Sequence, residues 1–170
     1  MRKLICALIC LFVLFSFAGC KDTNKAKGDG VDIEYYVNLG AIPESDIKIG
    51  DKVPESTNEN EDYFFSENGN ESYFSNGDFV YYYDSSKNDA TVKAISAFSK
   101  FYGFEIGAVT IEISDLLEAQ ELEYIERAPK TDELFFLPST GNFSVIEYKA
   151  QKHTLLFVFQ DNSLCAAYLE

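Results

Sequence analysis

The chain is short of the residues that most often build catalytic and metal sites. Among its 170 residues it has one histidine, four cysteines, one methionine and no tryptophan. The histidine, His153, is flanked by Lys152 and Thr154 in an expected hairpin turn, where a histidine is usually solvated. Structural zinc needs several Cys or His ligands, and a Ser-His-acid or Cys-His site would have to use this one histidine. The sequence therefore predicts no cofactor, no metal and a protein that is not an enzyme.

Basic residues are also scarce. The sequence has 14 Lys and Arg against 28 Asp and Glu, which gives a net charge of −14 at neutral pH. Nucleic acids and anionic lipids both bind through basic patches, so this balance argues against either as a partner. It is compatible with a cationic partner, but the need for solubility in a charged cell envelope explains it better.

The N-terminus, in contrast, is apolar and ends in a cysteine. Arg2 and Lys3 precede an apolar run over residues 4–18, which is the arrangement of a secretory signal peptide. The run is too short for a comfortable transmembrane helix, which needs about 20 apolar residues. Its end, the sequence FAGC at residues 17–20, resembles the lipobox of bacterial lipoproteins. An ordinary signal peptide with a cysteine near the cleavage site by chance is the alternative.

The lipobox resemblance implies a membrane anchor. Residues 1–19 would be removed as a signal peptide, and Cys20 would carry lipid, as in acylated lipoproteins that also bear palmitate. Two or more acyl chains give stable anchoring. Residues 20–31 are polar and contain two glycines, which predicts a flexible tether. We therefore expect a protein on the extracytoplasmic face of the cell membrane, periplasmic or extracellular, that contacts the membrane through the lipid on Cys20.

The mature chain would keep a single free cysteine. Cys6 and Cys10 would leave with the signal peptide and Cys20 would be consumed by lipid, which leaves only Cys165 and excludes an intramolecular disulfide. Cys165 lies in an apolar, strand-like run, which favours a buried and unreactive thiol over a reactive one.

Residues 32–170 are expected to form one α+β, β-rich domain built on an antiparallel sheet meander with one or two short helices. Apolar residues alternate over 32–39, which predicts a half-buried strand. Asn-Gly pairs at 68–69 and 76–77 predict hairpins. A helix is expected over 114–120, with Asp115 as its N-cap. Further strands are expected over residues 79–84, 134–136, 143–149, 155–159 and 164–169, with a tight turn at 161–163, while residues 90–99 fit either a helix or a strand.

The two halves of this domain resemble each other in order. The five matches pair residues 47–50 with 104–107, 63–65 with 134–136, 69–70 with 141–142, 79–84 with 155–161, and 92–95 with 164–167. They predict two tandem repeats, residues 42–103 and 104–170, in which the segment from residue 92 is a strand. Aromatic strands and glycine turns that look alike by chance are the alternative.

The repeat motif also carries a family resemblance. An isoleucine-glycine pair (Ile49-Gly50 and Ile106-Gly107), a short helix and a strand meander resemble the repeat of β-lactamase-inhibitor proteins. The motif is also similar to the small SmpA/OmlA lipoproteins of outer-membrane assembly. The resemblance implies tandem β-rich repeats, but no inhibitory residue is carried over and the inhibitors' disulfides are impossible here.

Tyr81, Tyr82 and Tyr83 are the candidate partner-binding residues. Successive side chains of a strand point to opposite faces, so at least one of the three must face each way. Tyrosine is favoured at protein interfaces. The sequence thus predicts a non-catalytic, envelope-associated protein-binding module whose protein partner is unknown.

A hydrolase that acts on cell-envelope glycans or peptides through acidic residues is the alternative function. Glu112, Asp115 and Glu118 could share one face of a helix. Charged helix faces are usually solvated, so this pattern by itself does not define a site.

Overall fold

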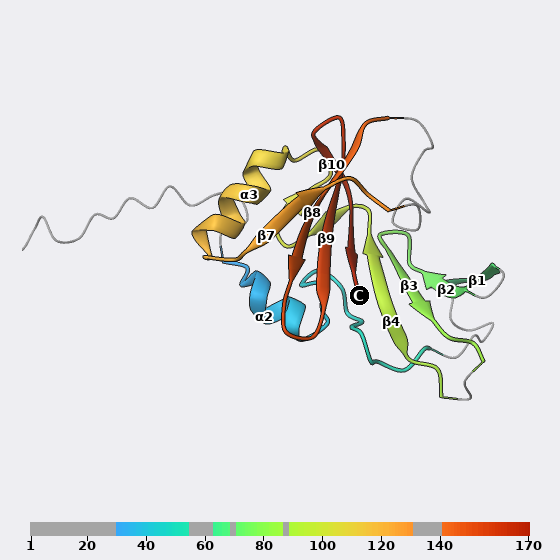
Figure 1. Cartoon of the computed structure of the whole chain (residues 1–170). Helices are drawn as coiled ribbons and strands as arrows, with labels where there is room; N and C mark the ends of the chain where they lie inside the picture. The colour runs from blue at the N-terminus through green and yellow to red at the C-terminus, as the bar shows by residue number, and fades with distance from the viewer. Residues whose placement is uncertain (1–29, 55–62, 69–70, 87–88, 131–140) are drawn as a thin grey trace, which may run out of the picture.

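A computed structural model describes residues 30–54, 63–68, 71–86, 89–130 and 141–170. Its main element is an antiparallel sheet of eight strands in the order β1-β2-β3-β4-β10-β9-β8-β7 (Figure 1). The strands are β1 (Phe64–Asn68), β2 (Glu71–Ser75), β3 (Phe79–Tyr83), β4 (Val92–Ala97), β7 (Tyr124–Arg127), β8 (Phe143–Lys149), β9 (Thr154–Gln160) and β10 (Ser163–Leu169). A two-stranded hairpin, β5 (Lys100–Phe101) and β6 (Phe104–Glu105), and the helices α2 (Ile33–Asn38) and α3 (Thr110–Ala119) complete the described part. The expected α+β, β-rich class with an antiparallel meander is confirmed.

The sheet consists of two four-stranded meanders joined through their last strands. Strands β1 to β4 form one meander and β7 to β10 the other, and β4 pairs with β10 at the centre of the sheet. The strand order is therefore the same from either end. Two copies of one unit would produce this order, although a duplication in the history of the sequence stays a prediction.

The register of the two meanders agrees as well. Each last strand has a β-bulge against its preceding partner, because the pairing shifts between Tyr82 and Tyr83 and again between Leu164 and Ala166. The shifts leave Lys93 unpaired in β4 and Cys165 unpaired in β10. An antiparallel strand that carries one extra residue bends and twists more strongly at that point. Because β4 begins at Val92, the segment from residue 92 is a strand, not a helix.

One of the five predicted matches does not follow this register. Residues 63–65 were matched with 134–136, which lie outside the described residues. In the sheet, the place opposite β1 is occupied by β7 (Tyr124–Arg127), which pairs with β8 as β1 pairs with β2. The sequence analysis did not predict β7, because a four-residue strand with charges at two positions shows no clear alternation.

The main core lies between the sheet and the helical layer. Ile33 and Val37 of α2, and Ile113 and Leu117 of α3, are all fully buried in it. Phe157 of β9 lies at its centre and contacts three rings of the β5–β6 hairpin at centroid distances of 6.1 to 6.3 Å. Burying one such large apolar side chain stabilises the fold by roughly 1.5–3 kcal/mol.

The predicted strand over residues 32–39 is wrong. Residues 33–38 form helix α2, and the Asp32 side chain caps it by accepting a hydrogen bond from the Tyr35 backbone nitrogen at 2.9 Å. Ile33 and Val37 are four residues apart, so they share one face of a helix as well as one face of a strand. The helix turns the other two alternating residues, Tyr35 and Leu39, outward.

The predicted start of the second helix is also wrong. Helix α3 begins at Thr110, four residues earlier, and its N-cap residue Val109 makes no side-chain capping bond. The Thr110 backbone nitrogen instead donates to the carbonyl of Asn162 at 3.3 Å. Asp115, the expected cap, lies exposed in the middle of the helix. A tertiary contact therefore replaces the local cap.

Candidate functional site

The predicted lipidation residue, Cys20, lies outside the described residues, so the anchor stays a prediction. Over the ranges that the structure describes, no helix is long and apolar enough to cross a membrane.

Tyr81 is a core residue. Its side chain is 1% exposed and its ring stacks on Phe74 of β2 at a centroid distance of 4.8 Å. The hydroxyl lies 2.9 Å from the Ser45 hydroxyl. Burial raises the pKa of Tyr81 to about 12, although the hydrogen bond to Ser45 acts in the opposite direction. Tyr81 therefore holds the segment before the sheet against β3 and presents no surface to a partner.

Tyr82 faces the other side of the sheet but is also buried, at 6% exposure. Its hydroxyl lies 3.2 Å from that of Ser96, and its ring meets Tyr168 edge to face at 5.9 Å. Tyr83 returns to the core side and is half-buried, 6.1 Å from the Phe74 ring. The expectation that this run exposes a tyrosine is thus wrong for Tyr81 and Tyr82, and Tyr83 is the most accessible of the three.

The face of the sheet opposite α2 and α3, here called the outer face, is rich in aromatic side chains. Tyr73, Phe98, Phe143 and Tyr168 are all half-buried on it. They surround two small clusters of buried residues: Val80, Tyr82 and Ala94 on one side, and Val145, Leu156, Val158 and Ala166 on the other. Phe98 and Tyr168 contact both clusters, so they join the two meanders across the central β4–β10 pair.

This surface was not predicted from the sequence. Strands of a sheet that is apolar on both faces do not alternate between apolar and polar residues, and the runs at residues 79–83 and 155–159 are of this kind. The signal was present as continuous apolar runs, but such runs do not tell which side faces the helices.

One ion pair lies at the margin of the outer face. Arg127 of β7 donates from Nε to Oε2 of Glu147 on β8 at 2.5 Å, and both side chains are about one-fifth exposed, at 19% and 21%. A charge-assisted hydrogen bond of this kind ties the last strand of the sheet to its neighbour.

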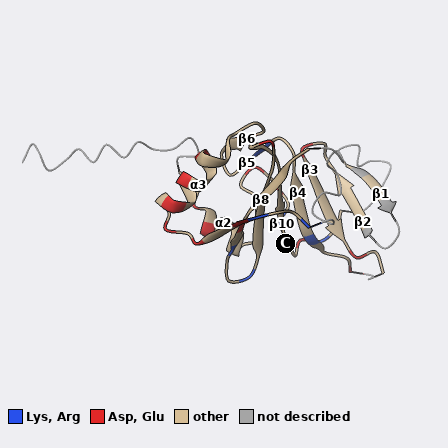
Figure 2. Ribbon diagram, turned by 45° about the horizontal axis from the view of Figure 1, so that its top comes forward, with Lys and Arg blue, Asp and Glu red and all other residues tan. Residues whose placement is uncertain are grey.

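The acidic residues considered for hydrolysis lie on α3, and none of them lines the groove described below. Asp115 and Glu118 are exposed, and Glu118 accepts a hydrogen bond from the Tyr124 hydroxyl at 3.1 Å. Acidic side chains do gather on α2 and α3, as Figure 2 shows. Within the described ranges no three His, Cys, Asp or Glu side chains are close enough together to hold a metal ion. His153 is half-buried, with Nδ1 3.3 Å from the carbonyl of Glu170.

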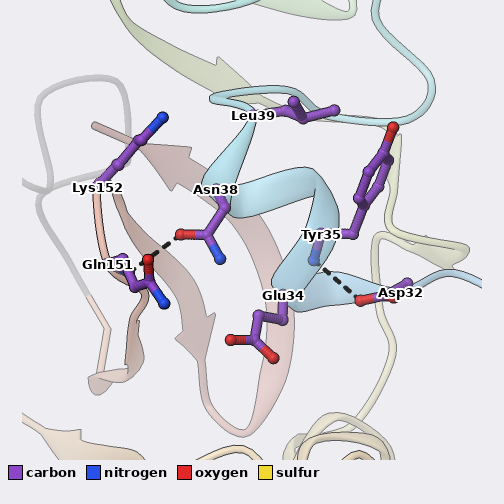
Figure 3. A pocket seen from close by; sticks show the side chains of 7 residues that line it. All are labelled: Asp32, Glu34, Tyr35, Asn38, Leu39, Gln151 and Lys152. Atoms are coloured by element: carbon purple, nitrogen blue, oxygen red, sulfur yellow. Dashed lines mark hydrogen bonds between the residues drawn. The ribbon is translucent and has the colours of Figure 1, made fainter.

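A shallow groove, here called the α2 groove, runs along the outward side of α2. Its volume is about 430 Å³. One wall is the helix and the other is the turn between β8 and β9 (Figure 3). The residues that line it are Asp32, Glu34, Tyr35, Asn38, Leu39, Gln151 and Lys152.

No protein-family model, no curated protein and no solved structure matches the chain. The resemblance to β-lactamase-inhibitor repeats and to SmpA/OmlA lipoproteins therefore stays a prediction.

Proposed function

We propose that this chain is a lipid-anchored, non-catalytic module on the extracytoplasmic side of a membrane, which holds another protein against the outer face of its sheet. The observation that carries the proposal is the set of half-buried aromatic side chains Tyr73, Phe98, Phe143 and Tyr168 on the face away from both helices. Contiguous exposed apolar surface often marks an interaction site. Aromatic residues are also the type most enriched at protein interfaces.

The strand framework of this surface supports binding rather than catalysis. The surface is built on hydrogen-bonded strands, and the hydroxyls of Tyr82 and Ser96 there already contact each other. A backbone that is already held in a sheet needs no ordering when a partner binds, which favours affinity. The proposed anchor adds to this, because a tether of about ten residues reaches at most about 35 Å and so keeps the module close to the membrane.

Site-specific photocrosslinking in the native host tests the outer face. A photoreactive phenylalanine analogue placed at Tyr73 or Phe98 should give a protein adduct of defined mass. The matched control position is Ile111 on α3, which is 61% exposed but lies on the helical side. Adducts that form equally at Ile111, or that form at neither outer-face position, would remove the support for this interface.

The anchor is tested separately. A Cys20→Ser variant should leave the membrane fraction and take up no labelled fatty acid, whereas the parent should stay in the membrane fraction and be labelled. If the two behave alike in fractionation and neither is labelled, the lipoprotein part of the proposal fails.

A further inference from the structure

Helix α2 is fastened at both ends, so its outward side is a rigid surface. At its start, the Gln120 side-chain amide donates to the carbonyl of Val31 at 2.8 Å and accepts from the backbone nitrogen of Ile33 at 3.1 Å. At its end, Asn38 Oδ1 accepts from the backbone nitrogen of Gln151 at 3.1 Å. A surface held in this way loses little conformational entropy when a ligand binds.

The outward side of α2 exposes two large apolar side chains. Tyr35, within the helix, is 56% exposed, and Leu39, the C-cap residue four positions later, is 43% exposed. Side chains at this spacing lie one above the other on a single helix face. Both line the α2 groove (Figure 3), so the groove offers apolar contact at its rim.

The charges of the α2 groove are mainly negative. Two carboxylates, Asp32 and Glu34, line it together with one ammonium, Lys152. Figure 3 shows Glu34 pointing away from Lys152. The Glu34 carboxylate makes no hydrogen bond or ion pair with any residue in the described ranges. The pKa of the neighbouring Tyr148 is raised, first by burial and then by these two carboxylates, which indicates a negative potential here.

We propose that the α2 groove docks a peptide segment of a partner protein in which a basic side chain adjoins an apolar one. The basic group would pair with Glu34, while its apolar neighbour packs on Tyr35 and Leu39. A guanidinium or ammonium can also lie over the exposed Tyr35 ring. Complementary charge speeds the encounter with a basic segment and disfavours an acidic one. The docking site is separate from the outer face, so either site can fail without the other.

The test is an NMR titration of the full mature chain. It carries Cys20→Ser, so that no lipid is present to bind the probe. The probe is the acetylated and amidated hexapeptide Gly-Lys-Leu-Lys-Leu-Gly, and its twin has Glu in place of Lys. The Lys peptide should shift the amide resonances of α2 and of the β8–β9 turn, and the Glu peptide should not.

Matched variants separate specific docking from general attraction to an acidic protein. Glu34→Gln and Tyr35→Ala should each weaken binding of the Lys peptide about fivefold or more. The control Glu123→Gln removes an exposed carboxylate away from the groove. The control Ile125→Ala removes an apolar side chain that is 56% exposed, as Tyr35 is. Each control should change binding of the Lys peptide less than about twofold.

Three results would overturn the proposal. Shifts that spread over the acidic surface and weaken equally with Glu123→Gln would mean non-specific charge attraction. Absence of shifts around α2 would mean that no basic segment docks there. Concentration-dependent shifts of the same amides without peptide would assign the groove to a second copy of this chain instead.

Thermal melting of each variant serves as the folding control. All the exchanged side chains are solvent-exposed, so we expect the variants to melt close to the parent.

Discussion

Gly50 and Gly107 make the same pair of backbone hydrogen bonds in the two halves of the sheet. The Gly50 nitrogen donates to the Val92 carbonyl at 2.8 Å, and the Val92 nitrogen donates back to Asp51 at 2.9 Å. The Gly107 nitrogen donates to Leu164, and Leu164 donates back to Ala108, both at 2.8 Å. Both glycines have a positive φ, +92° and +96°. Each isoleucine-glycine pair therefore holds the start of the last strand of its own meander.

This equivalence predicts equal costs for Gly50→Ala and Gly107→Ala. No atom lies within 4 Å of the added Cβ at either position, so the cost is backbone strain alone, about 1–2 kcal/mol each. Urea unfolding of both variants measures it. Gly77→Ala is the control, because Gly77 also has φ +96° and open space but does not hold a last strand. If one half tolerates the alanine and the other does not, the two turns are not equivalent.

Replacing Glu44 should loosen the β5–β6 hairpin from the N-terminal segment. The Glu44 carboxylate accepts from the backbone nitrogens of Tyr102 at 2.9 Å and Gly103 at 2.8 Å. Glutamine has only one side-chain acceptor oxygen, so Glu44→Gln leaves one nitrogen without its partner. We expect a loss of about 1–2 kcal/mol in the free energy of unfolding. Glu123→Gln, at an exposed position, should cost less than about 0.5 kcal/mol in the same measurement.

Tyr81 should make the fold sensitive to alkali. Its folded-state pKa of about 12 lies above the ordinary value of 10.0 because burial favours the neutral phenol. The folded state thus holds this proton more tightly. The resulting stabilisation is complete below pH 10 and is lost as the pH rises from 10 to 12, on the order of 2 kcal/mol.

The measurement is the free energy of unfolding of the parent and of Tyr81→Phe between pH 7 and 12. At pH 7 the variant should be about 1 kcal/mol less stable, because it lacks the hydroxyl contact with Ser45. The gap should shrink above pH 10 and reverse by pH 12, because the parent's loss of about 2 kcal/mol exceeds the initial difference of about 1 kcal/mol. A constant gap over the whole range would show that Tyr81 does not titrate with a raised pKa in the folded state.

Cys165 should react slowly in the folded protein. Burial raises the pKa of its thiol to about 11, and Sγ donates a weak hydrogen bond to the Val158 carbonyl at 3.2 Å. The thiolate is the reactive species, so its fraction at pH 8 falls about a hundredfold relative to a thiol of pKa 9.0. Alkylation by iodoacetamide, followed by mass spectrometry in a Cys20→Ser background, should be about a hundredfold faster in urea. Equal rates with and without urea would contradict a buried thiol.

Much of the second meander could be predicted from the sequence. Strands β8, β9 and β10 lie where the apolar runs placed them, and the turn between β9 and β10 has Asp161 and Asn162 at positive φ, 51° and 67°. A two-residue loop of this geometry matches the twist of the strands and favours Asp and Asn. Local chemistry thus suffices where a strand and its turn are neighbours in sequence.

The candidate surfaces could be predicted only in part. The three tyrosines of β3 were correctly placed on a strand, but exposure depends on what covers each face. Tyr82 is buried by Ser96 and Tyr168, which come from β4 and β10. No pattern within residues 79–84 contains that information. Cys20, in contrast, was singled out by the sequence alone, from its place after an apolar run.

The sequence by itself determined the class of the domain, the positions of most strands and the two glycine turns, because these follow from side-chain alternation and backbone geometry over a few residues. The tertiary structure decided that residues 33–38 are a helix. Ile33 and Val37 can be buried by either a strand or a helix, and the contacts of Gln120 with the backbone add to the Asp32 cap in favour of the helix. It also decided which apolar side chains remain outside, Tyr35 among them. Burial is a property of the neighbours that a fold brings together, and those neighbours are distant in the sequence.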